Sequence, residues 1–436
     1  MMSVEAYLDV IRDAIRPLAP SELELADAEG CVLAEDVTAA VSLPPFDNSG
    51  MDGYAVLASD VSSASASSPV TLPVTGEIAA GDVGTYRLVP GTAMRIMTGA
   101  RLPAGADAVV PVEWTDADDA RESGPAAREG GSRVSVRRPA SAGNAVRYVG
   151  EDARAGDVLL TAGVRMRPMH IAVAASAGRR AVRVRPRPRI VVLSTGNELA
   201  EPGTPLVPGQ IWESNSYMLA ALAREAGAVA CRRSVVPDEV DGVLPAISSQ
   251  LGEADLVITT GGVSMGGEHD VVKAALASLG TVAFRKVAMQ PGMPQGFGVI
   301  RGSGSAGASG AAGAVPIFTF PGNPVSAYVS FQLFARPALG FLQGLDDMRL
   351  PVASAVLTAP VRSPAGRRSY LRGVLSPGRE APSPGTGTPS PGTVEPLSGQ
   401  GSHQVAALGR ANCLIIVPER EAQLPAGHTV DVLVLP

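Results

Sequence analysis

Hydrophobic residues divide the chain into a central region of alternating strands and helices and two flanking regions of short strands. Between residues 190 and 344, apolar runs alternate with amphipathic stretches, which is the order of strands and helices in βαβ units. The runs 190–193 and 256–258 are apolar throughout, as in parallel strands that are covered on both faces. The pattern therefore predicts an open parallel α/β sheet domain in the centre of the chain.

The flanking regions have shorter apolar runs than the centre. Residues 1–16 have the spacing of a short amphipathic helix, whereas residues 44–115 and 345–436 interrupt short β-type runs with turns. The second pattern is typical of small barrels and sandwiches. Two inserts rich in Gly, Ser and Pro, 302–314 and 376–392, have the composition of surface loops. We therefore expect a multidomain α/β plus β protein.

The composition is that of a globular protein, and it argues against several classes of function. Apolar residues make up 45% and charged residues 18% of 436 residues, a length that suggests about three domains. The net charge of −6 argues against a protein that mainly binds nucleic acid through its phosphates. The arginine-rich strip 179–189 has no interleaved aromatic residues, so we expect a strand and a linker there. No run approaches the ~20 apolar residues that cross a bilayer.

The cysteines and the N-terminal residues indicate a cytoplasmic protein. Cys31, Cys231 and Cys413 are far apart and form neither a CxxC pair nor a disulfide framework. The first residues interleave acidic and apolar side chains, which differs from the order in a signal peptide. We therefore expect a reducing, cytoplasmic compartment.

Polar residues follow the apolar strands of the central region. The carboxyl ends of parallel strands meet at one edge of a sheet, and ligands bind there. Glu198 follows strand 190–193, Asp238 follows 231–236, Asp270 follows 255–260, and PGNPVS, whose Asn and Pro are typical of a helix start, follows 317–320. Clustered carboxylates repel each other by about 4 kcal/mol per pair at 4 Å in a dielectric near 20, so a cluster calls for a cation such as Mg²⁺. Alternatively, Asp238 and Asp270 cap the following helices, and Glu198 is solvated.

Two turn-rich loops are further candidates for ligand binding. Residues 261–264, GGVS, leave backbone N–H groups free for an anion, although a tight turn explains the same residues. Residues 44–56 either hold a ligand or form a plain turn, and they display Asp47, Asn48, Ser49 and Asp52. The four histidines have no metal-ligand spacing, and the sequence contains neither a P-loop nor a hydrolase elbow.

Taken in order, these motifs closely resemble the molybdopterin molybdenumtransferase family, to which the gephyrin E domain also belongs. The resemblance spans nearly the whole chain and is carried by PPFDNSGMDGYAV, RIMTGARLPAGADAVVPVE, GEDARAGD, LSTGNEL, PDE, TTGGVSMG, FPGNPVSA, RGVL and QGSH. It implies an enzyme of molybdenum cofactor biosynthesis that inserts molybdate at the dithiolene sulfurs of adenylylated molybdopterin and releases AMP, with Mg²⁺ as cofactor. It also implies a homodimer whose further partners are the adenylyltransferase of the pathway and the recipient molybdoenzymes, with no nucleic acid and no membrane.

The resemblance implies four domains. They are an α/β molybdopterin-binding domain from 1–20 and 180–344, a linking domain from 21–45 and 145–179, a β domain from 46–144 and a C-terminal β-barrel-like domain from 345–436. The two-segment linking domain and the return of the N-terminal helix to the α/β domain come from the resemblance rather than from the apolar pattern.

Site residues carry over by matching motifs. The implied catalytic residues are Asp52, Thr98, Asp152, Glu198, Asp238 and Asp270, and the implied metal ligands are Glu198, Asp238 and Asp270. The implied substrate-binding residues are Gly261, Gly262, Ser264, Lys286, Pro321, Gly322, Asn323, Arg372 and Ser402. In this arrangement carboxylates hold magnesium against the pyrophosphate, Lys286 and Arg372 offset anionic charge, and Ser402 and Thr98 donate hydrogen bonds.

The sequence departs from the family at two places, and two other functions are open. Gln290 and Met293 stand where the family often has lysine, and a loop one residue longer leaves Glu268 as an alternative to Asp270. One alternative function is the adenylyltransferase of the same pathway, which usually has GGTG in place of GGVS and lacks the β domains. The other is a non-catalytic scaffold of the same fold.

Overall fold

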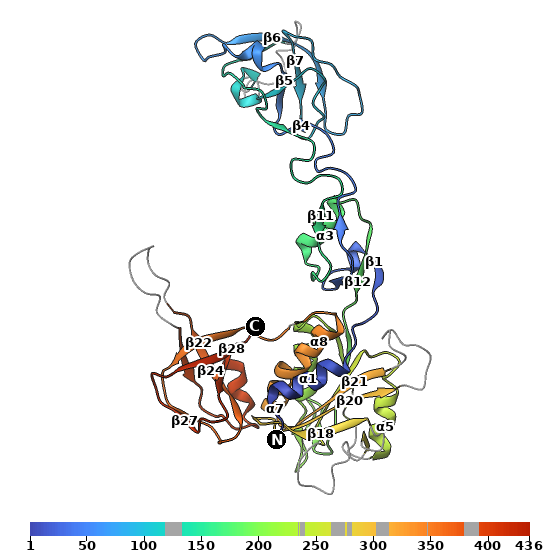
Figure 1. Cartoon of the computed structure of the whole chain (residues 1–436), viewed down its shortest axis with the longest axis vertical. Helices are drawn as coiled ribbons and strands as arrows, with labels where there is room; N and C mark the ends of the chain where they lie inside the picture. Colours follow the sequence, from blue (N-terminus) through green and yellow to red (C-terminus); the bar gives the residue numbers. More distant parts are fainter. Residues whose placement is uncertain are drawn as a thin grey trace. The chain divides into compact units, whose positions relative to one another are not determined.

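The computed structural model forms two compact units, each with its own hydrophobic cores (Figure 1). It describes residues 1–117, 133–233, 235, 240–262, 275–276, 281–301, 314–346, 348–378 and 392–436. The larger unit comprises Met1–Leu23, Ala28–Ala34 and Arg183–Pro436, and the smaller unit comprises Glu24–Asp27 and Glu35–Val182.

A six-stranded sheet forms the centre of the larger unit, in the order β16-β13-β17-β21-β20-β18. Its strands are β13 (Arg189–Ser194), β16 (Val229–Arg232), β17 (Leu256–Thr260), β18 (Val282–Lys286), β20 (Pro294–Arg301) and β21 (Ala314–Phe320). The first four strands in this order are parallel, as predicted. The prediction of a purely parallel sheet was wrong for β20 and β18, which pair antiparallel because a short connection returns the chain beside itself. The strand predicted at 231–236 ends at Arg232, the last residue that pairs with β13.

Helices cover both faces of this sheet. They are α1 (Val4–Ala14), α4 (Asn215–Glu225), α5 (Val240–Ser248), α7 (Pro324–Ser330), the π-helix η4 (Phe331–Ala335) and α8 (Arg336–Leu342). Ile190 and Val192 pack on one face with α1, α4, α7 and α8, while Val191 and Leu193 pack on the other with α5. Because successive strand residues point to opposite faces, an all-apolar strand fits a sheet that is covered by helices on both faces. Figure 1 shows α1 beside α7 and α8.

A closed barrel forms the C-terminal part of the larger unit. Its strands are β22 (Val352–Leu357), β24 (Arg368–Ser376), β25 (Gly392–Pro396), β26 (Cys413–Val417) and β28 (Thr429–Val434). They pair in the order β24-β25-β22-β28-β26, and β26 pairs back with β24. A short strand from the α/β region, β19 (Met289–Gln290), adds to β24 in parallel. The barrel therefore lies against the segment that connects β18 to β20.

The smaller unit contains a five-stranded sheet in the order β8-β5-β7-β6-β9. Its strands are β5 (Gly53–Val56), β6 (Val70–Ile78), β7 (Ala93–Ile96), β8 (Ala108–Pro111) and β9 (Arg133–Val136). The short-strand pattern of 44–115 thus forms a β domain, as predicted.

Other elements of the chain are β1 (Ser21–Glu24), η1 (Leu25–Asp27), β2 (Val32–Leu33), β3 (Val37–Thr38), β4 (Asn48–Ser49), η2 (Ala58–Val61), η3 (Val112–Trp114), β10 (Val146–Arg147), β11 (Val158–Leu160), α3 (Pro168–Ser176), β12 (Ala181–Arg185), β14 (Leu199–Ala200), β15 (Ile211–Trp212), β23 (Val361–Arg362), η5 (Val405–Arg410) and β27 (Gln423–Leu424).

Several side chains of the arginine-rich strip bind acceptors within the chain. Arg185 donates to the carbonyl of Leu18 at 2.9 Å, and Arg187 donates through Nε to the carbonyl of Gly227 at 2.9 Å. Arg189 pairs with the buried Asp255 at 3.2 Å. These arginines therefore connect elements of the fold. No helix among the described residues is long and apolar enough to cross a membrane.

Candidate active site

A cavity of about 790 Å³ lies at the carboxyl edge of the α/β sheet, within the larger unit. The loops after β13, β17 and β21 line it, together with residues 211–215, residues 290–294 and barrel residues that include Arg367 and Ser402. The carboxyl ends of these strands therefore meet at one edge, as the sequence predicts. Gly261, Gly262, Glu198, Pro321, Gly322, Asn323 and Ser402, all predicted site residues, line this cavity.

Gly261 brings two of these loops into direct contact. Its φ is +102°, in the region that favours glycine, and a Cβ atom built on it would lie 2.4 Å from the carbonyl oxygen of Thr195. Its N–H donates to the carbonyl of Phe320 at 3.1 Å, so the loop after β17 is also fixed to β21. Glycine is therefore required here by the packing of the loops themselves.

Asn215 connects the loops that surround the cavity, and it was not predicted as a site residue from the sequence. Its Nδ2 donates to Thr260 Oγ1 at 3.0 Å and to the carbonyl of Gly322 at 2.6 Å. One buried amide at the start of α4 thus holds the ends of β17 and β21. The only signal in the sequence was an Asn at the beginning of a helical pattern, where a capping role explains it equally well.

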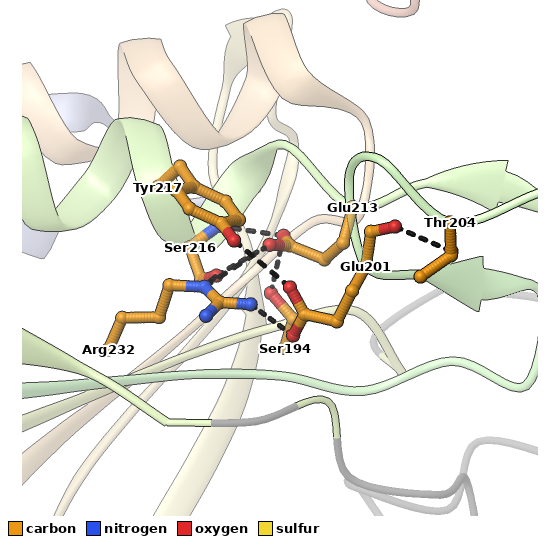
Figure 2. A network of polar contacts seen from close by, with 7 residues as sticks. All are labelled: Ser194, Glu201, Thr204, Glu213, Ser216, Tyr217 and Arg232. Atoms are coloured by element: carbon orange, nitrogen blue, oxygen red, sulfur yellow. Dashed lines mark hydrogen bonds and ion pairs between the residues drawn. The ribbon is translucent and has the colours of Figure 1, made fainter.

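Glu213 is a buried carboxylate in the wall of the cavity, with a side chain only 1% exposed. Figure 2 shows that it lies between the end of β13 and the start of α4. It accepts hydrogen bonds from Ser194 Oγ at 2.8 Å, from the N–H of Ser216 at 2.8 Å and from Ser216 Oγ at 2.5 Å. Buried charge is costly unless it is hydrogen-bonded, and three donors compensate this one.

Arg232 extends this network to the surface (Figure 2). It donates to Ser216 Oγ at 2.9 Å, lies 3.9 Å from the Glu213 carboxylate and forms an ion pair with Glu201. Its guanidinium stacks 4.0 Å from the centre of the Tyr217 ring. The hydrogen bond from Arg232 lowers the pKa of Glu201, and the hydrogen bond to Glu201 raises the pKa of Tyr217. The network therefore joins β16 to the loop between β14 and β15.

Glu198 is the one predicted metal ligand that the described residues contain. Its carboxylate is exposed, lines the cavity and folds over Gly196, where an added Cβ would lie 2.6 Å from Oε2. An exposed carboxylate oxygen is the kind of donor that Mg²⁺ prefers, so this residue fits that ion. Asp238, Asp270, the alternative Glu268 and Ser264 lie outside the described residues. Within the described ranges, no group of three His, Cys, Asp or Glu side chains is arranged to hold a metal.

The barrel contributes Ser402 to the cavity, and a buried arginine supports it. Ser402 Oγ accepts from Asn323 Nδ2 at 3.1 Å, and its carbonyl accepts from the N–H of Val325 at 3.0 Å. Asn323 occupies the N-cap position of α7 as predicted, but its side chain binds Ser402 and caps no helix N–H. Arg372 is fully buried and donates to the carbonyls of Gly399 and Gly401, so it holds the loop before Ser402 and does not line the cavity. Burial lowers the pKa of Arg372.

The cationic residue at this cavity is neither Lys286 nor Arg372, the two that the resemblance suggested. Lys286 is exposed at the end of β18, opposite Pro294, and does not line the cavity. Arg367 is the only lysine or arginine among the described lining residues, and it donates to Gln290 Oε1 at 3.4 Å. Arg367 was not predicted from the sequence because it precedes β24 and meets Gln290 only through the pairing of β19 with β24.

The remaining predicted site residues belong to the smaller unit. Thr98 donates to Asp52 Oδ1 through both its N–H and its Oγ1, each at 2.8 Å, so these two residues are brought together. Asp152 is exposed in the turn after β10, and its N–H donates to the carbonyl of Leu43 at 2.9 Å. Asp47, on the same turn-rich loop as Asp52, accepts from the N–H of Val149 at 2.8 Å, which fixes the loop to that turn.

A helix-covered sheet with a ligand-sized cavity at its carboxyl edge and a barrel beside it defines a multidomain α/β plus β protein with a binding site at that edge. Family models match three parts of the chain: the MoeA N-terminal region (domain I and II) at residues 2–178, the probable molybdopterin binding domain at 191–340 and the MoeA C-terminal region (domain IV) at 354–435. The chain belongs to the molybdopterin molybdenumtransferase family.

Relatives and solved structures match along the whole chain. Molybdopterin molybdenumtransferase 2 of Mycobacterium tuberculosis (strain ATCC 25618 / H37Rv) is 43% identical over 99% of this chain and 99% of its own length. The molybdopterin molybdenumtransferase of Haemophilus influenzae is 33% identical over 95% of this chain and 94% of its own. The crystal structure of the molybdopterin biosynthesis MoeA protein from Pyrococcus horikoshii aligns with a TM-score of 0.75 at 29% identity, covering 100% of this chain and 99% of that one. These matches confirm the predicted family and fold class.

Proposed function

We propose that this protein inserts molybdate into adenylylated molybdopterin and releases AMP, as a step of molybdenum cofactor biosynthesis. The observation that supports this most is the cavity at the carboxyl edge of the sheet, whose described lining includes an exposed carboxylate, Glu198, and a cation, Arg367. Full-length similarity to relatives named molybdopterin molybdenumtransferase favours this function over the adenylyltransferase, which lacks the β domains, and over the scaffold.

The residues of the cavity suggest how the reaction is prepared. Arg367 offsets the charge of phosphate or of the incoming molybdate, since a guanidinium binds oxyanions through paired N–H groups. Ser402, which accepts its hydrogen bond from Asn323, keeps a hydroxyl proton for an oxyanion. Asn215 and Gly261 hold the three strand ends in contact, so these groups keep a fixed geometry.

Magnesium, the homodimer and the cytoplasmic location are further parts of the proposal. Glu198 would hold Mg²⁺ together with the carboxylates predicted to follow β16 and β17, and the bound ion would neutralise phosphate oxygens during cleavage of the pyrophosphate. The smaller unit contains Asp52, Thr98 and Asp152, which the resemblance to the family implies as catalytic residues. The adenylyltransferase of the pathway and the recipient molybdoenzymes are the expected partners.

The test is AMP release by the purified protein from adenylylated molybdopterin, measured with and without molybdate and with and without magnesium. We expect release that depends on both ions, and EDTA should abolish it. Glu198→Gln should lower kcat/KM by at least about tenfold. Glu395→Gln, on the exposed side of β25, is the matched control and should retain activity. If the protein binds substrate tightly but releases no AMP under any condition, the enzymatic proposal fails and the scaffold is favoured.

A further inference from the structure

Trp212 presents an uncovered aromatic surface at the edge of the cavity. It lines the cavity, and 54% of the residue is exposed. It is one of only two tryptophans in the chain, and no aromatic ring in the part of the chain that the structure describes packs against it. Exposed tryptophan that lines a concave site is typical of ligand contact rather than of folding, because the indole carries a large apolar surface.

The indole of Trp212 is held in place. Its Nε1 donates to the carbonyl of Thr204 at 2.9 Å. The backbone on both sides is paired, because the N–H of Ile211 donates to the backbone carbonyl of Glu198 and the N–H of Glu213 donates to that of Ala200, each at 2.8 Å. The polar edge of the ring is therefore satisfied within the protein, while its apolar surface remains available.

The residue that follows Trp212 anchors this segment in the core. Glu213 is buried and accepts three hydrogen bonds from Ser194 and Ser216, as Figure 2 shows. Trp212 comes directly before this anchored residue and is 54% exposed, so the burial of Glu213 fixes the backbone from which the indole projects. A ring fixed in this way loses little conformational entropy when a ligand packs against it.

We propose that Trp212 is a stacking platform for a fused heteroaromatic ring of the substrate, either the pterin or the adenine of adenylylated molybdopterin. This inference rests on the proposed function and adds a subsite to it. A planar, polarisable indole stacks on such rings whatever their hydrogen-bonding edges. A cavity of about 790 Å³ also lies within the range of about 300–1,000 Å³ that is typical of small-molecule and cofactor sites.

Fluorescence tests the inference directly. Trp114 lies in the smaller unit, so Trp114→Phe leaves Trp212 as the only tryptophan of the full-length protein. AMP and a free pterin are titrated separately into this variant. Saturable quenching by AMP alone assigns the adenine to Trp212, and quenching by the pterin alone assigns the pterin. If neither compound changes the emission at millimolar concentration, the inference is overturned.

Two substitutions separate stacking from general packing. Trp212→Phe retains a ring, whereas Trp212→Leu retains only apolar bulk. In equilibrium dialysis of the quenching compound, we expect Trp212→Leu to bind about tenfold more weakly, and Trp212→Phe to stay within about threefold of the unmodified protein. Equal affinities for all three proteins would overturn the inference.

The AMP-release assay distinguishes failure of this inference from failure of the proposed function. We expect Trp212→Leu to raise KM for adenylylated molybdopterin about tenfold while KM for molybdate stays unchanged. If the unmodified protein releases AMP and Trp212→Leu has the same KM, the subsite is wrong and the function stands. If the unmodified protein releases no AMP but AMP or the pterin quenches Trp212, the function is wrong and the ring-binding subsite stands.

Discussion

The Glu213 carboxylate is the most informative residue to change, because one buried charge connects three elements around the cavity. Glu213→Ala removes the acceptor for Ser194 Oγ, for the N–H of Ser216 and for Ser216 Oγ. Both serines are 1% exposed, so water cannot replace the lost acceptor in the folded protein. A hydrogen bond to a charged group contributes about 1.5 kcal/mol or more, so three lost bonds predict a free energy of unfolding lower by about 4.5 kcal/mol.

The exposed carboxylate of the same network is the matched control. Glu201 also binds Arg232, but its side chain is 39% exposed. Because exposed ion pairs contribute about 0–1 kcal/mol, Glu201→Ala should lower the free energy of unfolding by less than about 1 kcal/mol. Glu213→Gln keeps one oxygen acceptor, so its free energy of unfolding should lie between those of the two alanine variants.

Urea unfolding measures the difference in free energy of unfolding between these variants. Unfolding is followed by the fluorescence emission of Trp212 in proteins that also carry Trp114→Phe. Trp212 adjoins Glu213 and reports on the α/β region, which is necessary because a multidomain chain does not unfold in one step. With a slope of about 1–3 kcal/mol per molar urea, Glu213→Ala should lower the midpoint by about 1.5–4.5 M. A midpoint no lower than that of Glu201→Ala would refute the reasoning.

Three further predictions concern charge, packing and thiol chemistry. Arg367→Ala should raise KM for molybdate about tenfold with CD spectra unchanged, and Arg367→Lys should recover part of that loss; unaltered KM would contradict a charge role. Gly261→Ala should abolish soluble expression and AMP release, because the added Cβ would lie 2.4 Å from a backbone carbonyl oxygen. Gly409→Ala, where the added Cβ meets open space, should retain both in the same assays. Burial raises the pKa of Cys413 to about 11, so at pH 8 a thiol reagent should modify exposed Cys231 well before Cys413. Since the folded pKa is the higher one, the unfolded chain loses its proton first, and stability measured by urea unfolding should fall between about pH 9 and 11.

Local patterns were sufficient for the features that depend on neighbours along the chain. The all-apolar runs at 190–193 and 256–258 predicted parallel strands covered on both faces, and Ile190 and Val191 indeed pack in different cores. The order of strand, polar loop and helix placed Glu198 and Gly261 at one edge of the sheet, where both line the cavity. These results follow from the sequence because the pleat of a strand and the handedness of its crossovers leave few arrangements.

The sequence alone determined the family, the α/β sheet, the barrel and the loops from which the cavity is built. Only the tertiary structure showed that Arg367, from the barrel, meets Gln290, and that buried Arg372 supports the loop before Ser402. It also showed that Glu213 is buried while Trp212 faces the cavity. The physical reason is that such contacts join segments far apart along the chain, and their geometry arises only when the sheet and the barrel pack together. Burial and charge pairing are properties of that packing, so no local pattern encodes them.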